Sequence, residues 1–399
     1  MLNFHQTKVK AFLAFLMLSA VTLSTFTAKQ AFATNGMLFD GYGPISQAMG
    51  GASMAYDNGT AAMSNNPATL GLMPDGNRVD IALGFLMPDV RYETPGKTYK
   101  SSSDLFLMPA IGYVRKDGDF AYGIGMYSLG GMGTDYLDDN LGMYSQVIVG
   151  KILVPFAYDV TDKFTIGATI SLTQAQMDIV LKPRGPMMPK FDFKDGSDFS
   201  GATSDYGVSG KLGFTYKLHD RFTIGGAYHN KGGIGDLTGK GARVEGFDMP
   251  ATANIGFAAN ITDDLMFTAD YQKIFWSEVM QTITITQGNQ KAELRQDWRD
   301  QNVVSMGLAY TLPSLPELTL RAGVNLGDNP VNKNATPMFP AIIENHYTAG
   351  FGYKFNETHS VNASFSYAPK VRVNNDGMFR GTSTTHEQTS SQIMYSINF

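Results

Sequence analysis

Residue types that could perform catalysis are few in this 399-residue chain, and they do not cluster. The sequence contains no cysteine and no G-x-S-x-G motif. Two of the six histidines, His219 and His359, fall in short polar turns, and His229, His346 and His386 fall in separate predicted strands. A hydrolase or a metal centre needs a nucleophile, a base or ligands at a supporting spacing. We therefore predict no enzyme, no metal site and no cofactor.

Two arginines have chemistry that suits a ligand. In residues 304–310 every even position is apolar or aromatic, so the odd-numbered Arg295 and Arg299 share the opposite, polar face. A guanidinium binds a carboxylate through two parallel hydrogen bonds, and a carboxylate in apolar surroundings needs such a partner. The spacing predicts that Arg299, supported by Arg295, binds a carboxylate. The alternative is that Arg299 forms an ion pair with Asp297 or Asp300.

The first 33 residues have the features of a secretory signal peptide. A polar and basic start precedes the apolar run from Ala11 to Leu23, and the sequence AFA at residues 31–33 offers a cleavage site. This run is shorter than the ~20 residues that span a bilayer, and no later segment comes close to a transmembrane helix. We expect export, and entry into a membrane only as a barrel. The net charge of -5 gives no reason to expect a nucleic acid partner.

Apolar and small or polar residues alternate along many segments of the remaining chain. Residues 347–355 read YTAGFGYKF and residues 164–173 read FTIGATISLT. Because side chains on a strand point to alternate faces, each segment has one oily face and one small or polar face. Trp276 and the tyrosines at strand ends are predicted to lie at the membrane interfaces.

The connections between these segments alternate between short and long. Short polar turns are predicted at residues 116–119, 161–163, 219–221, 262–264, 313–317 and 356–358. Longer loops are predicted near residues 95–103, 134–144, 183–202, 231–248, 288–293, 328–340 and 374–385. This pattern predicts an all-β fold, a transmembrane barrel of fourteen antiparallel strands over residues 76–399, with apolar side chains toward lipid. A soluble sandwich or propeller is the alternative, but it does not explain the alternating connections.

A barrel of this size leaves a wide channel, and the residues before the first strand are candidates to fill it. Residues 34–75 are rich in Gly, Ala, Met and Asn and show no period-two pattern. Pro67 suits the first turn of a short helix. A disordered tail is the alternative, but Met, Leu, Tyr and Ala are too frequent for a solvated linker. We predict that residues 34–75 form an N-terminal hatch with short helices inside the barrel.

Several stretches of the chain resemble one known family. These are AMGGASMAYDN at residues 48–58, NNPATL at residues 65–70, TADYQKIFWSE at residues 268–278, DWRDQNVVSMGLAY at residues 297–310 and LTLRAGVNLGDNPV at residues 318–331. The sequence is similar in these stretches to the FadL family of outer-membrane transporters for long-chain fatty acids and aromatic hydrocarbons. The resemblance extends over almost the whole mature chain.

The resemblance implies a monomeric barrel whose hatch includes Asn66, Pro67 and Ala68. It also implies lateral release of a hydrophobic ligand through a gap made by a kinked third strand. That strand is predicted at residues 120–136, where Gly130, Gly131 and Gly133 interrupt the outer half. Glycine inside a strand weakens the ladder and often marks a bulge. The alternative is that these glycines only mark the end of a strand near a loop.

The predicted ligand pocket departs from the fatty acid carriers of the family. Carboxylate-binding members carry a basic residue at the position of Arg299, but near the top of the fifth strand, where they tend to place another, the inward residues here are Met177 and Ile179. We expect these three residues, with Arg295, to contact a ligand. Their composition leaves both a fatty acid and a neutral aromatic hydrocarbon open.

The predicted function is a passive channel for hydrophobic small molecules in the outer membrane of a Gram-negative cell. No motif resembles a phosphate-binding loop, so no ATP is expected. The expected partners are the hydrophobic ligand and outer-membrane lipid. The alternatives are a channel specific for neutral aromatic hydrocarbons, a structural or adhesive barrel, and an open porin for polar solutes.

Overall fold

The computed structural model describes residues 35–139, 141–182, 189–196, 199–331, 336–376 and 379–399. The predicted signal peptide, residues 1–33, lies outside this part of the chain. In the described part no helix is long and apolar enough to cross a membrane.

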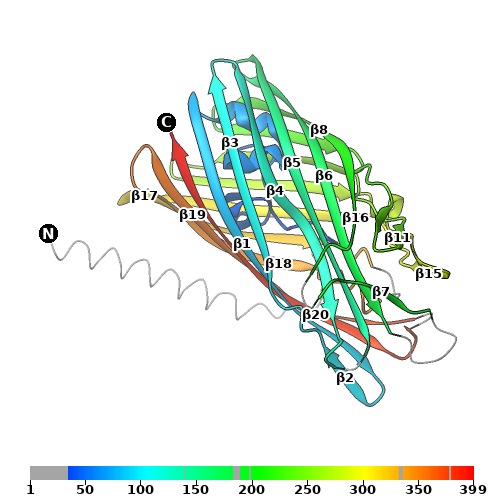
Figure 1. The fold of residues 1–399 in the computed structure, drawn as a ribbon. Coiled ribbons are helices and arrows are strands. Elements are labelled where there is room, and N and C mark those ends of the chain that lie inside the picture. Colours follow the sequence, from blue (N-terminus) through cyan, green and yellow to red (C-terminus); the bar gives the residue numbers. More distant parts are fainter. Residues whose placement is uncertain (1–34, 140, 183–188, 197–198, 332–335, 377–378) are drawn as a thin grey trace. The chain divides into compact units, whose positions relative to one another are not determined.

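Fourteen strands form the wall of a closed antiparallel barrel, as predicted (Figure 1). Each wall strand pairs with the next one in the sequence, and the first pairs with the last from Arg78–Asn398 to Glu93–Ser383, which closes the barrel. The wall strands are β1 (Gly76–Thr94), β3 (Phe106–Asp117), β4 (Phe120–Asp135), β5 (Met143–Thr161), β6 (Phe164–Leu181), β8 (Thr203–His219), β9 (Phe222–His229), β12 (Thr252–Asn260), β13 (Leu265–Ile274), β16 (Gln301–Leu312), β17 (Leu315–Gly327), β18 (Asn345–Lys354), β19 (His359–Asn374) and β20 (Ser383–Asn398).

The alternation of side chains along the wall strands places apolar residues outside. On β6, Ile166, Ile170 and Leu172 are exposed, whereas Thr169 and Ser171 between them are buried. The apolar faces of the other strands are exposed in the same way, for example Val208 on β8. A closed ladder with an apolar exterior satisfies every backbone group inside a bilayer, so the strand pattern and the membrane location have the same physical origin.

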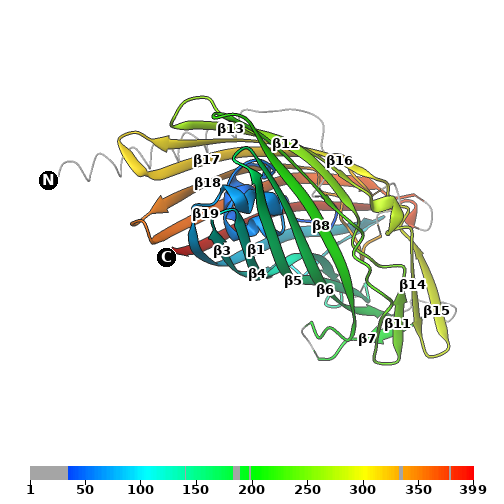
Figure 2. The same ribbon diagram turned by 90° about the horizontal axis from the view of Figure 1, so that it is seen from above.

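Short turns join the wall strands at one end of the barrel, and long connections join them at the other. The long connections contain additional short strands, which extend the sheet beyond the wall (Figure 2). These are β2 (Lys97–Lys100), β7 (Phe191–Phe193), β10 (Leu237–Gly239), β11 (Ala242–Glu245), β14 (Thr282–Gln287) and β15 (Gln290–Arg295). The connection between β13 and β16 covers residues 275–300 and is longer than the loop predicted at residues 288–293, because β14 and β15 form a hairpin within it.

The segment before the wall contains the short helices α2 (Pro44–Ala48), η1 (Gly59–Met63) and η2 (Pro67–Leu72). Hydrogen bonds join this segment to strands on several sides of the barrel. The amides of Ser53 and Met54 donate to Asp270 of β13, at 2.6 and 3.1 Å, and the amide of Gly50 donates to Thr348 of β18. The amide of Thr60 donates to Asp80 of β1, at 2.7 Å. Figure 2 shows these helices enclosed by the strands.

Candidate functional site

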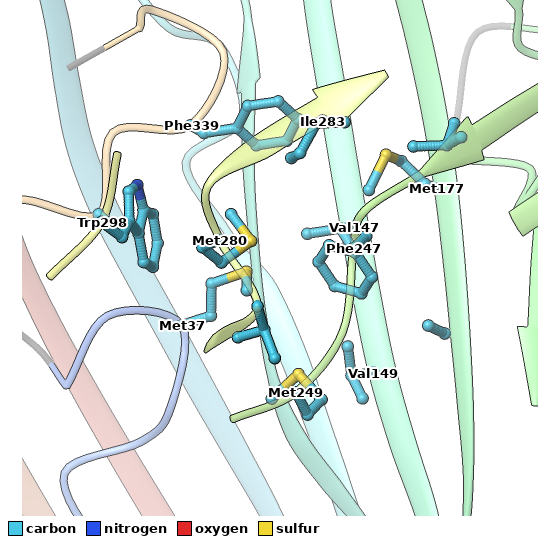
Figure 3. Close-up of a cluster of buried hydrophobic side chains, with 14 of the residues drawn as sticks. Met37, Val147, Val149, Met177, Phe247, Met249, Met280, Ile283, Trp298 and Phe339 are labelled. Carbon is cyan, nitrogen blue, oxygen red and sulfur yellow. The ribbon is translucent and has the colours of Figure 1, made fainter. Parts of the chain in front are cut away.

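A large group of buried apolar side chains fills the lumen toward the end with the long connections (Figure 3). We name it the upper apolar cluster. The wall contributes Val147 and Val149 of β5 and Met177 and Ile179 of β6, and all four side chains are completely buried. In the β5–β6 ladder Val147 lies opposite Met177. The structure thus places Met177 and Ile179, two of the predicted ligand contacts, together in an apolar part of the lumen.

The long connections and the N-terminal segment supply the rest of the upper apolar cluster. Figure 3 shows Met249, Met280 and Phe339 from three connections, with Met37 beside them, converging on the wall residues. Methionine side chains are flexible and polarizable, so such a lining adapts to ligands of different shape.

Trp276 also lies in this cluster, and its prediction as a membrane-interface residue is wrong. The side chain is fully buried, packs edge to face on Trp298 with ring centroids 4.9 Å apart, and donates from Nε1 to Gln301 at 3.2 Å. The physical reason is local: β13 ends at Ile274, and the short helix η3 (Trp276–Glu278) turns the chain away from the wall.

The wall is interrupted beside the upper apolar cluster. The ladder between β3 and β4 runs from Asp117–Phe120 only as far as Ala110–Tyr127. On its other side β4 stays paired with β5 through Asp135, but the register shifts between Ser128 and Gly130. The outer part of β4 therefore has a ladder on one side only.

The three predicted kink glycines lie in this stretch of β4, which is paired with β5 but not with β3. Gly130 forms an isolated bridge with Leu38, and a Cβ atom there would lie 2.0 Å from the carbonyl oxygen of Met37. Gly131 and Gly133 line a cavity of about 40 Å³ between β1, β3, β4 and β20 and residues 36–39. The glycines thus give the N-terminal segment access to the wall at the position where the β3–β4 ladder ends.

Asn66, Pro67 and Ala68 fix the N-terminal segment to another part of the wall. The Asn66 side chain accepts from the amide of Ala68 at 3.1 Å and donates to the carbonyls of Met54 and Phe214 at 2.7 and 3.0 Å. Pro67 begins η2, where its missing N–H is not needed. A single side chain therefore caps a helix and ties it to β8.

Arg295 and Arg299 lie away from the upper apolar cluster, so their predicted lumenal orientation is wrong. Arg295 is exposed at the end of β15 and forms an ion pair with Asp297 at 2.7 Å. Arg299 is also exposed, and its Nε donates to the carbonyl of Asn329 at 3.0 Å. The backbone of Asp297 has a φ of 48°, and β16 begins only at Gln301, so the period-two count from residues 304–310 does not reach either arginine.

Two lysines occupy the lumen instead, and the sequence analysis did not single them out. Lys151 is an inward residue of β5, two positions from Val149, and it is 5% exposed. Lys211 lies on β8, and its Nζ donates to the carbonyls of Ser64 and Asn65 in the N-terminal segment. The signal for Lys151 was present in the sequence, because VIVGKIL places it on the same face as Val147 and Val149.

Carboxyl groups outside the wall strands have altered acidity, among them Glu344 and Asp57. Burial raises the pKa of Glu344, at the end of the β17–β18 connection, to about 7, although an Asn329 hydrogen bond and the charge of Arg299 act in the opposite direction. Burial also disfavours ionisation of Asp57 in the N-terminal segment, but the charge and hydrogen bonds of Arg78 outweigh it and hold the pKa of Asp57 below its usual value. The Asp57–Arg78 pair, at 2.7 Å, is thus a charged link between this segment and β1.

Comparison with known proteins gives one consistent result. The model of a family described as outer membrane protein transport protein (OMPP1/FadL/TodX) matches residues 20–399. The crystal structure of the toluene transporter TodX of P. putida superposes with a TM-score of 0.79 at 28% identity, covering 90% of this chain and 99% of that one. The toluene transporter TbuX of Ralstonia pickettii has a TM-score of 0.73 at 26% identity, covering 90% and 99%. A FadL homologue of Pseudomonas aeruginosa, at 17% identity, shares the fold with a TM-score of 0.73, covering 91% and 100%.

Curated relatives match over shorter regions. Outer membrane protein P1 of Haemophilus influenzae is 24% identical over 181 residues, which is 42% of this chain and 39% of that protein. An uncharacterized protein of Chlorobium limicola is 47% identical over 87 residues, 21% of this chain and 43% of that protein. The matched regions span less than half of the length of these relatives.

Proposed function

Because the chain belongs to the OMPP1/FadL/TodX family of outer membrane transport proteins, we propose that it is a passive channel through which hydrophobic small molecules enter the cell. The chain is an outer-membrane β-barrel, and its family is one of transport channels rather than enzymes. The ligand class is that of long-chain fatty acids or aromatic hydrocarbons. Two of the similar structures are named as toluene transporters, which supports the aromatic part of this class.

The observation that carries the proposal is the meeting of the upper apolar cluster with the interruption between β3 and β4. A ligand from outside enters the cluster, where removing apolar surface from water favours binding by roughly 25 cal/mol per Å². It then leaves sideways past Gly130, Gly131 and Gly133 into the bilayer. The first step transfers the ligand from water to apolar side chains and the second from these side chains to lipid, and neither step requires an energy source.

Residues 34–75 act in this proposal as the hatch that closes the straight path to the periplasm. The hydrogen bonds of Ser53 and Met54 to Asp270, and of Asn66 to Phe214, support this role because they attach the segment to well-separated strands. An open porin for polar solutes would need this segment out of the lumen. The described contacts between the chain's own segments need no second copy, and we propose a monomer.

Replacement of Gly130, Gly131 and Gly133 by valine tests the lateral route. Valine favours a regular strand, and its side chain would fill the interruption. We expect uptake of toluene and of oleate by cells to fall to the level of a deletion strain, while the barrel keeps its resistance to unfolding in detergent at moderate temperature. Normal uptake by a folded triple variant would contradict lateral release.

Two further variants separate closure of the gap from general damage. Gly150→Val on the neighbouring β5 is a matched control, because the nearest atom to its Cβ is 4.0 Å away, and it should transport normally. Gly133→Val alone should move neighbouring atoms less than Gly130→Val does. A Cβ atom at Gly133 lies 3.0 Å from the Ser145 carbonyl oxygen, whereas one at Gly130 collides with the Met37 carbonyl. We expect partial loss of uptake for Gly133→Val.

A further inference from the structure

A group of cationic and polar side chains lies in the lumen between the upper apolar cluster and the N-terminal segment. Lys151 Nζ of β5 is 2.8 Å from Nε2 of His229 at the end of β9, and Ser209 Oγ of β8 is 3.2 Å from the same nitrogen. With Lys151 as an ammonium, which only donates, Nε2 of His229 is the acceptor of this hydrogen bond. Lys151 then keeps two further N–H donors, and its side chain lines an enclosed cavity.

The charge of Lys151 has no anion in contact with it among the described residues. Other lysines of the described residues, such as Lys116 and Lys231, do form ion pairs with carboxylates. The Asp248 carboxylate attracts Lys151 only from a longer distance, and its oxygens already accept from the amides of Gly233, Ile234 and Met249. Lys211 is bound to carbonyls rather than to a carboxylate. An enclosed ammonium without a counter-charge is costly, so the arrangement favours an anion that comes from outside the chain.

The space beside these lysines has the size of a head group. A cavity of about 50 Å³ is lined by Lys151, Lys211, His229 and Ser171 of the wall, and by Ser64 and Tyr42 of the N-terminal segment. A water molecule needs about 10–15 Å³ on this measure, so the cavity accommodates a small polar group and not a whole amphiphile.

The apolar part of such a ligand has a place immediately next to this cavity. Val149 and Val147 precede Lys151 on the same face of β5. Leu38, Leu129 and Met249 line the cavity and also belong to the upper apolar cluster. A chain that leaves the cavity toward the long connections thus passes between apolar side chains, including flexible methionines.

We propose that Lys151 and Lys211, with Lys151 held by His229, bind the carboxylate of an amphiphilic ligand whose apolar tail lies in the upper apolar cluster. This inference rests on the proposed function and narrows its ligand class to monocarboxylates with an apolar tail. Long-chain fatty acids and alkylated aromatic acids both combine one carboxylate with an apolar part. The ligand is bound with its head group toward the periplasmic side.

The test compares ligands that differ only in the head group. The full chain, purified in an uncharged detergent, is titrated with oleate and with oleyl alcohol, and in a second arm with p-toluate and with toluene. The variant Lys151→Met replaces the lysine by an uncharged side chain of similar length. We expect oleate affinity to fall about tenfold or more, since a charged hydrogen bond is removed, while oleyl alcohol affinity stays unchanged. The p-toluate arm shows whether aromatic acids use the same site.

Matched variants give the result its meaning. Lys217→Met removes an exposed lysine from the same strand as Lys211 and should change neither affinity. Lys151→Arg keeps the charge and should retain most of the oleate affinity. Equal effects of Lys151→Met on oleate and oleyl alcohol, or no effect on oleate, would overturn the carboxylate site. Wild-type binding of the alcohol and of toluene without preference for the acids would overturn it too, while leaving the proposed function intact. Binding of none of the four ligands would contradict the proposed function itself.

Discussion

The basic side chains of this barrel lie in two kinds of environment, and the difference decides what each can bind. Arg295 and Arg299 are exposed near the long connections, where water screens their charge and a single ion pair contributes little. Lys151 is enclosed between wall and N-terminal segment, where the low dielectric strengthens any interaction with an anion. Residue type alone favours arginine as a carboxylate partner, but enclosure favours the lysine.

Arg299→Ala therefore has a different expected outcome from Lys151→Met. The Arg299 guanidinium donates to the Asn329 carbonyl outside the upper apolar cluster. We expect its removal to change oleate and toluene affinity by less than about twofold, as for surface ion pairs. Titration of the purified variant with both ligands is the measurement. A loss of oleate affinity that toluene does not share would return Arg299 to the binding site.

The error over Arg299 has an identifiable cause. Period-two reasoning holds only while the strand continues, and β16 begins at Gln301. Asp297, just before β16, has a positive φ that changes the direction of the chain. An aspartate in a sequence does not by itself predict this conformation. Lys151, inside the long strand β5, was within reach of the same reasoning, because five regular residues on either side fix which way it points.

The interruption of the wall is a property of paired strands rather than of one residue. β4 loses its partner on the β3 side beyond Tyr127, and Pro109 of β3, which has no N–H to donate, lies at that point. Gly130 then admits the backbone of Met37 and Leu38. The glycines could be recognised in the sequence. The end of the β3–β4 ladder could not, because it depends on where β3 stops pairing with β4 and continues to pair only with β1.

The connection between β17 and β18 should respond to pH through Glu344. Its pKa is about 7 in the folded chain against an ordinary 4.5, chiefly because of burial. A group whose pKa is raised on folding stabilises the folded state below its ordinary pKa, and this contribution is lost as pH rises from about 4.5 to about 7. We expect faster hydrogen exchange of residues 336–345 at pH 8 than at pH 5, after correction for intrinsic rates.

Glu344→Gln is the control for this assignment. The amide cannot ionise, so the protection of residues 336–345 should then be nearly the same at both pH values and close to that of the native chain at pH 5. A pH effect that survives in the variant would assign it to a group other than Glu344.

The barrel as a unit was predictable because its constraints are regular. Alternation over residues 164–173 and turns such as 161–163 and 219–221 specify wall strands with little help from tertiary contacts. The contents of the lumen were less predictable. Trp276, Phe339 and Met249 come from irregular connections, whose direction depends on contacts with other segments and not on a local period.

Removal of residues 35–72 tests how the barrel and its N-terminal segment divide their roles. The wall ladder closes between β1 and β20 without this segment, so a folded barrel is expected. Fourteen strands leave an aqueous bore when nothing fills it. We expect the shortened chain to form steady, ion-conducting pores in planar bilayers, whereas the full chain conducts little. Asp80 and Asp270, which lose the amides of Thr60 and Ser53, would then face water and favour cations over anions. A shortened barrel that stays folded but conducts no more than the full chain would show that the wall and its long connections close the bore by themselves.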